Sequence, residues 1–158
     1  MQIWIDGDAC PKLIKEILFR AAIRTKTNLI IVSNHVVSTP SSPFIKKCVV
    51  HGGFDVADNH IADNLLENDL VITADIPLAD IVVTKKGIAL NPRGELYSAN
   101  NIKQILAMRN LNESLRSSGM ISGGCGKIGP RDIQNFSNNL DRIITKYANK
   151  EPDSKNLN

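Results

Sequence analysis

The chain has 158 residues, the usual length of one domain, and its 42% hydrophobic and 22% charged residues are typical of a globular protein. Aromatic residues make up only 4%, which predicts an aliphatic core and disfavours an aromatic stacking surface for single-stranded nucleic acid. The net charge of +3 permits an anionic partner but does not require one.

The cysteines and the hydropathy indicate the compartment. The three cysteines, Cys10, Cys48 and Cys125, form no C-x-x-C pair, which disfavours a disulfide framework and a zinc site. No apolar stretch reaches the ~20 residues that span a bilayer, and the N-terminus carries no signal-type apolar run. We therefore expect a cytoplasmic protein with no membrane partner.

The first third of the chain predicts strands around one helix. Residues 2–6 form a short apolar strand, and Pro11 stands at the first position of a helix. The apolar stripe of that helix consists of Leu13, Ile14, Ile17, Leu18, Ala21 and Ala22. Strands are predicted at 28–33 and 45–50, on either side of a loop rich in serine and proline. A strand–helix–strand beginning is typical of a parallel sheet.

The remaining elements continue this alternation. We predict helices at about 55–66, 76–85 and 98–117, with Gly119 at the end of the last, and strands at 69–73 and 88–90. Pro130 begins a final helix with one apolar side. Residues 1–148 are thus expected to form a single α/β domain, and the polar tail 149–158 is expected to be disordered.

Acidic residues stand where the predicted strands end. In an open parallel sheet, ligands bind outside the carboxyl ends of the strands. Asp6 and Asp8 follow the first strand, and Asp75 follows the fourth. Asp58 begins a helix on the side that faces the sheet, together with Ile61, Ala62 and Leu65. We therefore expect carboxylates from three different junctions to meet at one edge of the sheet.

Such a cluster predicts a metal site. Converging carboxylates raise one another's pKa, and a hard divalent cation with oxygen ligands, Mg²⁺ or Mn²⁺, removes that cost. The predicted ligands are Asp6, Asp58 and Asp75, with Asp8 as a further ligand or as the group that orients an attacking water. The alternative is structural, since aspartate is a good helix N-cap and Asp8 or Asp55 could serve as one.

Four other side chains near this edge have open roles. Lys12 and Arg93 are candidates for binding phosphate, although Arg93 could instead tie a loop to backbone carbonyls. Asn91 is expected to form an Asx-turn before Pro92 rather than to bind metal. Cys10 lies at a helix N-terminus, where a thiolate is favoured, but packing beneath the loop is the expected role.

A glycine-rich loop at 123–129 does not match a phosphate-binding P-loop. Ile121 and Ile128 occupy the first and last positions of the Walker A pattern, which requires glycine and Ser or Thr there. The loop could bind an anion weakly at the following helix N-terminus, or serve as a flexible link.

Five motifs together carry a resemblance to a known family. They are DGDACP (6–11), GFDVADN (53–59), VITADIPLA (71–79), LNPRGELY (90–97) and LDR (140–142). In combination they closely resemble the YaiI/YqxD family of uncharacterised bacterial proteins, from about residue 1 to 146. The chain departs from the family at Gly7, where alanine is usual, and in the stretch GGCGKIGPRD, where the family often has GGP and a variable segment.

The family is regarded as PIN-like, so the resemblance implies a three-layer PIN-like (Rossmann-like) α/β fold with a mainly parallel central sheet flanked by helices. It also implies an acidic cluster of the kind found in metal-dependent nucleases, with Asp6 and Asp75 as the strand-end aspartates and Asp58 as the helix-borne one. Asp8 can join this cluster, whereas Asp80 is a weaker match. The function implied is divalent-metal-dependent hydrolysis of RNA or single-stranded DNA.

Two other functions remain open from the residues alone. A strand that ends in D-x-D also begins haloacid-dehalogenase-like phosphatases, with Asp6 as nucleophile, Ser33 as phosphate ligand and Lys85 or Lys86 as the lysine. Pro11 leaves no room for the flap that usually follows this motif. The third possibility is a non-catalytic module that binds a metal or nucleic acid.

Overall fold

The computed structural model describes residues 1–53, 55–117 and 127–148. The strands are β1 (Gln2–Asp6), β2 (Asn28–Ser33), β3 (Ile45–Val49), β4 (Leu70–Ile72), β5 (Ile88–Leu90) and β6 (Leu96–Tyr97). The helices are α1 (Lys12–Thr25), α2 (Val56–Asn64), α3 (Ile76–Thr84), α4 (Ile102–Ser117) and α5 (Pro130–Ala148).

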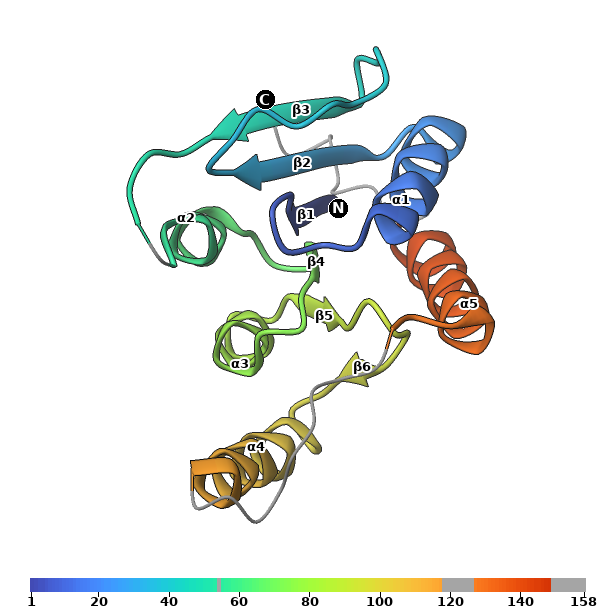
Figure 1. Ribbon diagram of the computed structural model, residues 1–158. Helices are drawn as coiled ribbons and strands as arrows, with labels where there is room; N and C mark the ends of the chain where they lie inside the picture. Colours follow the sequence, from blue (N-terminus) through green and yellow to red (C-terminus); the bar gives the residue numbers. More distant parts are fainter. Residues whose placement is uncertain (54, 118–126, 149–158) are drawn as a thin grey trace, which may run out of the picture.

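One sheet carries all six strands in the order β3-β2-β1-β4-β5-β6 (Figure 1). All neighbouring strands are parallel except β5 and β6. The chain winds outward from β1 to β3, returns to the centre at β4, and winds outward on the other side. The winding direction therefore reverses between β1 and β4, and such a switch point is where open α/β sheets bind ligands.

Helices cover both faces of the sheet, because side chains along each strand alternate between the faces. Ile3 and Ile5 of β1 pack into a core with α1 and α5, whereas Trp4 between them packs into a second core with α2 and α3. Ile102 at the start of α4 joins this second core. The result is the three-layer, mainly parallel α/β fold that the sequence predicted (Figure 1).

The apolar stripe predicted for the first helix was wrong at two positions: it included Leu13, which is exposed, and it omitted Phe19, which is buried. The buried residues of α1 are Ile14, Leu18, Phe19, Ala21 and Ala22. Leu13, which we placed in the stripe, is 52% exposed. Periodicity cannot separate a position at the margin of a helix face from one at its centre, and the packing of the sheet decides between them.

The segment after β5 contains a strand that the sequence did not predict. Leu96 and Tyr97 form β6, which pairs with β5 through a tight turn. In that turn the amide of Gly94 donates to the carbonyl of Asn91 at 2.8 Å, and Gly94 has φ +95°. A two-residue strand is too short to leave a period-2 pattern.

The following helix, α4, begins at Ile102 rather than at the predicted position 98. The amide of Ser98 donates to Asn101 Oδ1 at 2.7 Å, and the amide of Asn101 donates to Ser98 Oγ at 3.3 Å. This reciprocal pair is a capping arrangement with Ser98 at the N-cap, so the predicted position marks the cap and the regular helix follows from Ile102.

Some predictions lie outside the described residues: the tail 149–158, the end of the helix near Gly119, and most of the glycine-rich loop. Within the described ranges, no helix has both the length and the hydropathy to cross a membrane.

A buried carboxylate joins β1 to β4 at the amino ends of these strands, the edge of the sheet opposite their carboxyl ends. Asp69 is only 3% exposed, and its Oδ1 accepts from the amide of Gln2 at 3.0 Å. Its Oδ2 accepts from the indole Nε1 of Trp4 at 3.0 Å and from the amide of Leu66 at 2.9 Å. Three donors from two segments therefore depend on one side chain.

We expect Asp69→Asn to lower the free energy of unfolding by about 3 kcal/mol, because an amide group leaves buried donors unsatisfied. Urea titration followed by far-ultraviolet circular dichroism measures the change. Glu67→Gln is the matched control, since Glu67 is exposed two residues away. Equal stability of the two variants would contradict the role assigned to Asp69.

Candidate functional site: an acidic pocket at the carboxyl edge of the sheet

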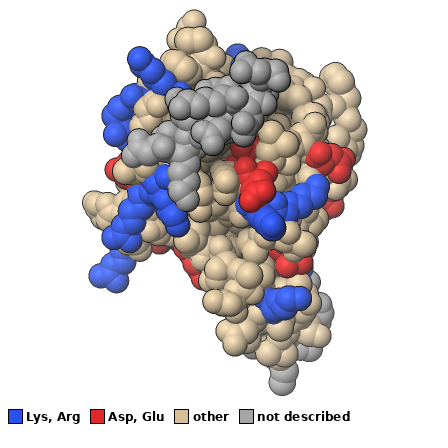
Figure 2. All heavy atoms as spheres, turned by 180° about the vertical axis from the view of Figure 1, so that it is seen from behind, with Lys and Arg blue, Asp and Glu red and all other residues tan. Residues whose placement is uncertain are grey.

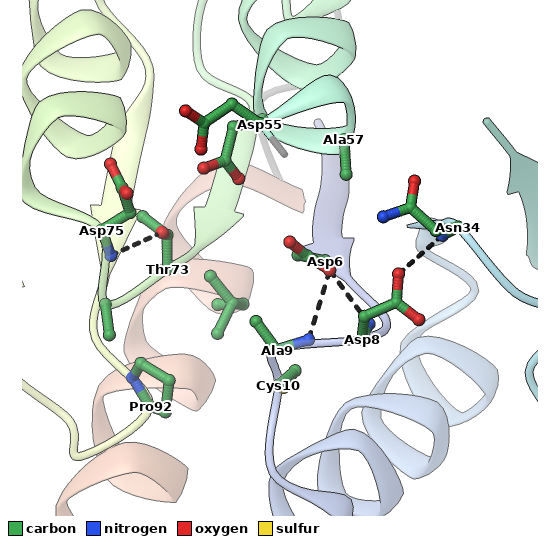
Figure 3. Close-up of a pocket in the computed structure, with 13 residues that line it drawn as sticks. Asp6, Asp8, Ala9, Cys10, Asn34, Asp55, Ala57, Thr73, Asp75 and Pro92 are labelled. Atoms are coloured by element: carbon green, nitrogen blue, oxygen red, sulfur yellow. Dashed lines mark hydrogen bonds between the residues drawn. The ribbon is translucent and has the colours of Figure 1, made fainter. Parts of the chain in front are cut away.

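A cavity of about 320 Å³ opens at the switch point between β1 and β4 (Figure 3). Its acidic lining residues are Asp6, Asp8, Asp55, Asp58 and Asp75. The other residues that line it include Cys10, Asn34, Thr73 and Pro92, so loops after all five parallel strands contribute. The four aspartates that the sequence singled out are therefore brought together, with Asp55 as an addition. We call this cavity the acidic pocket.

Asp6 is held in place by the loop that follows it. Its Oδ1 accepts from the amide of Asp8 at 2.9 Å and from the amide of Ala9 at 3.2 Å. Gly7 lets this loop lie close to β2, because a Cβ at position 7 would stand 2.8 Å from Cγ1 of Ile31. The D-G-D sequence thus forms a tight turn that fixes one oxygen of Asp6 and leaves Oδ2 at the pocket.

Asp8 joins two loops rather than capping α1. Its Oδ2 accepts from the amide of Asn34 at 2.6 Å, and its Oδ1 lies 3.4 Å from Nδ1 of His35. The N-cap of α1 is Pro11, without a side-chain hydrogen bond. Figure 3 shows the carboxylate of Asp8 turned toward Asn34, on the side of the pocket away from Asp75.

Asp75 is the N-cap of α3. Its Oδ1 accepts from the amide of Leu78 at 2.8 Å, and its own amide donates to Oγ1 of Thr73 at 2.9 Å. The cap is typical for a helix with proline in its first turn, here Pro77. One oxygen of Asp75 is therefore used by the helix, and the second is available at the pocket.

Two acidic residues reach the pocket from the start of α2. Asp55 occupies the N-cap position with φ 66° and makes no side-chain cap bond. Asp58, in the first turn, has its pKa raised from 3.8 to about 6, first by burial and then by the negative charges of Asp75, Asp6 and Asp55. These four carboxylates therefore interact electrostatically across the pocket. From the sequence, Asp55 was a possible helix N-cap near this edge and was not among the predicted ligands.

The two basic residues predicted to bind phosphate do not line the pocket. Lys12 is exposed on the first turn of α1. Nη1 of Arg93 forms an ion pair with Oδ2 of Asp132 at 2.8 Å, which joins the turn after β5 to the start of α5. The predicted Asx-turn is confirmed, since the amide of Arg93 donates to Asn91 Oδ1 at 2.8 Å.

Cys10 packs beneath the loop, as expected. It is 8% exposed, and burial raises the pKa of its thiol to about 12, although the positive charge of Lys15 opposes the shift. Nζ of Lys15 also donates to the carbonyl of Gly7 at 3.1 Å. Lys15, which the sequence did not single out, therefore supports the turn that carries Asp6.

The donor chemistry of the pocket fits a hard cation, because the carboxylates supply oxygen ligands and their mutual repulsion favours a positive partner. Among the described residues, no group of three or more His, Cys, Asp or Glu side chains is placed so that it could hold a metal ion together. Mg²⁺ is usually held by one or two carboxylates and keeps several waters, so a complete protein cage is not required.

Positive charge is not concentrated on the face that Figure 2 shows. Lys and Arg side chains stand there in separate groups with Asp and Glu between them. The net charge of +3 therefore does not produce a single basic surface on this face.

The burial of Cys10 predicts slow alkylation. We expect iodoacetamide at pH 8 to label Cys10 at least ~100-fold more slowly than a free thiol, because the thiolate is the nucleophile. Cys48, which is half-buried with Sγ 3.5 Å from Nε2 of His60, is the internal comparison. Peptide mass mapping gives both rates, and rapid labelling of Cys10 in the folded chain would contradict its burial.

The raised pKa of Asp58 predicts a pH-dependent stability in the absence of metal. The folded chain binds more protons than the unfolded chain between pH 3.8 and about 6, so its free energy of unfolding falls as the pH rises through this range. Asp58 is only partly buried, and solvent screening reduces the effect to about 1 kcal/mol.

We therefore expect Asp58→Asn to raise the Tm in EDTA by roughly 2–4 °C above pH 6. Below pH 3.8 the two proteins should melt alike. Asp63→Asn, on the exposed side of the same helix, is the control. Thermal melts across this pH range make the comparison, and a difference that does not change with pH would contradict the electrostatic origin.

Comparisons with known proteins agree on one family. A UPF0178 protein of Maridesulfovibrio salexigens is 55% identical over 150 residues, which cover 95% of this chain and 99% of the relative. A UPF0178 protein of Legionella pneumophila strain Paris is 56% identical over 146 residues, or 92% of this chain and 99% of the relative. No solved structure matches the chain. The model of the family described as "Uncharacterized BCR, YaiI/YqxD family" matches residues 4–146, so the chain belongs to the YaiI/YqxD family.

Proposed function

We propose that this chain hydrolyses phosphodiester bonds in RNA or single-stranded DNA with a divalent metal ion bound at the acidic pocket. The observation that carries the proposal is the convergence of Asp6, Asp58 and Asp75, from three separate strand–helix junctions, on one cavity at the switch point of the sheet. Mutual repulsion makes such an arrangement unfavourable for stability alone, and ligand binding gives it a purpose.

In this proposal one or two of the carboxylates of Asp6, Asp58 and Asp75 bind Mg²⁺ or Mn²⁺ directly, and water molecules link the ion to the remaining one. A bound ion of this kind would activate water and offset the negative charge that develops at phosphorus. Asp55 adds negative charge on the α2 side of the same pocket. Each of the turns around Asp6 and Asp75 already binds one carboxylate oxygen, so these ligands are oriented before any ion arrives.

Asp8 is proposed to orient the attacking water. Its Oδ2 is held by the amide of Asn34, which keeps the carboxylate beside Asp6 at the rim of the pocket. Lys12 and Arg93 stay predictions as phosphate contacts. Since neither lines the pocket, the proposal gives them only contacts with more distant phosphates.

The geometry gives the phosphatase alternative less support. Ser33, its required phosphate ligand, is 2% exposed and donates its hydroxyl to the carbonyl of His35. Lys85, the candidate lysine, stands at the end of α3 and donates to the carbonyl of Ala62. A helix begins at Lys12 directly after Pro11, so no flap follows the first strand.

The test is a double variant, Asp6→Asn with Asp75→Asn. Asparagine keeps an acceptor oxygen for the backbone amides that each side chain binds, so the loops should stay folded while two negative charges are lost. We expect at least a tenfold weaker affinity for Mn²⁺ by titration calorimetry, because the loss of even one charged interaction lowers an affinity by about that factor and two charges are removed. Cleavage of a labelled single-stranded oligonucleotide in Mn²⁺ should be abolished.

Asp63→Asn is the control, since it removes a carboxylate from α2 that lies outside the pocket. Undiminished Mn²⁺ binding by the double variant would remove the proposed site. Metal binding by the wild-type chain without any cleavage product would instead favour the non-catalytic binding module.

A further inference from the structure

A second cavity adjoins the acidic pocket. It has a volume of about 290 Å³ and shares Asp55, Asp58 and Asp75 with the acidic pocket. Its other lining residues come from α2, α3 and α4: Asn59, Ala62, Pro77, Leu78, Ile81 and Arg109. We call it the side cavity. The shared aspartates form the boundary between the two, so one ligand can occupy both.

The side cavity differs in character from the acidic pocket. Its wall is apolar, formed by Ala62 of α2 and by Pro77, Leu78 and Ile81 of α3, and Ile81 is 41% exposed. Asn59 supplies an amide that can both donate and accept hydrogen bonds. Apolar walls with a few polar groups are typical of sites that bind organic ligands.

Arg109 brings positive charge to the side cavity. Among the described residues that line the two cavities, it is the one lysine or arginine. An arginine can bind a phosphate through two parallel hydrogen bonds.

We propose that the side cavity binds one nucleotide of a single strand, next to the phosphodiester that lies in the acidic pocket, and that Arg109 binds the phosphate of that nucleotide. This inference rests on the proposed function and names its substrate class. The sugar and base contact the wall of Pro77, Leu78 and Ile81, and Asn59 hydrogen-bonds to the base. A paired base is not free to enter such a cavity, which is why a single strand is required.

The position of Arg109 in the side cavity also bears on the repulsion between the acidic pocket and a nucleic acid. A polynucleotide backbone is anionic, and the acidic pocket without metal repels it. A cation at the side cavity holds the adjoining phosphate while a metal ion is bound by the aspartates. Small phosphodiesters that have no adjoining nucleotide gain nothing from Arg109, so the structure predicts selectivity for chains over small esters.

The experiment compares Arg109→Gln, Arg109→Lys and the control Arg142→Gln with the wild-type protein. Arg142 lies exposed on α5, which packs on the opposite face of the sheet. The substrates are a fluorescein-labelled ten-nucleotide uridine oligomer and bis(4-nitrophenyl) phosphate, both in Mn²⁺. We expect Arg109→Gln to raise the KM for the oligomer about tenfold or more, the loss of a charged hydrogen bond. Arg109→Lys should recover part of this loss, and hydrolysis of the small ester should stay within twofold.

The salt dependence of binding gives a second readout. With Ca²⁺ in place of Mn²⁺, fluorescence anisotropy measures binding of the same oligomer without turnover. Losing one phosphate contact to a single strand lowers the slope of log affinity against log salt by about 0.7. Equal slopes and affinities for the wild type and Arg109→Gln would overturn the inference, as would an equal loss of activity on both substrates.

The two proposals fail in different ways. If the wild-type protein cleaves neither substrate, the proposed function fails, while the anisotropy experiment still tests the side cavity. If it cleaves the oligomer and Arg109→Gln is indistinguishable from Arg142→Gln, the inference fails and the proposed function stands. Binding of a duplex as tightly as the single strand would overturn the assignment of a single strand.

Discussion

The parallel pairing of β1 with β4 is the constraint on which the rest of the structure depends. These strands lie side by side although more than sixty residues separate Ile3 from its partner Leu70. The chain leaves β1 toward the α1 face and leaves β4 toward the α3 face, so a crevice opens between the two exits. Asp69 secures the pair from the opposite edge by binding the amide of Gln2 and the indole of Trp4. The position of the acidic pocket therefore depends on a residue at the far end of the same strands.

Backbone amides hold most of the acidic pocket in place. Asp6, Asp8 and Asp75 each bind at least one amide of a turn or helix end, which orients their carboxylates at the edge of the sheet. Asp58 has no such bond in the described part of the chain. Burial and the neighbouring negative charges raise its pKa, so its ionised form is the least favourable in the pocket without a cation. In the proposed nuclease function, the aspartates that backbone amides already orient bind a metal ion without a further loss of side-chain freedom. The side cavity then places an apolar wall and a guanidinium beside these oxygens.

Several features could not be predicted because their signals are not local. Leu13 fits the helical stripe by spacing, yet no neighbouring element covers it. β6 is too short to show a period, and it exists because β5 offers an open edge. The sequence left two roles for Arg93, binding a phosphate or fixing a loop. The packing of α5 places Asp132 beside it, and the two side chains form an ion pair. Arg109 carries no motif at all, since only the packing of α4 beside α3 brings it to the boundary of the side cavity.

The sequence by itself determined the succession along the chain of the helices and of strands β1 to β5, the parallel sheet, the family, and the aspartates that stand at strand ends. These follow from apolar periodicity and from short motifs, which act over a few residues. Only the tertiary structure decided which oxygens of those aspartates are already bound to the backbone, that Asp55 joins them, and that a second cavity lies alongside. The physical reason is that these properties depend on distances between segments far apart in the chain, and the packing of helices on the two faces of the sheet sets those distances. In IWIDGDACPK the letters identify Asp6 and Asp8 as a pair. In the fold both line the acidic pocket, but Asp6 binds amides of its own turn and Asp8 binds the loop after β2.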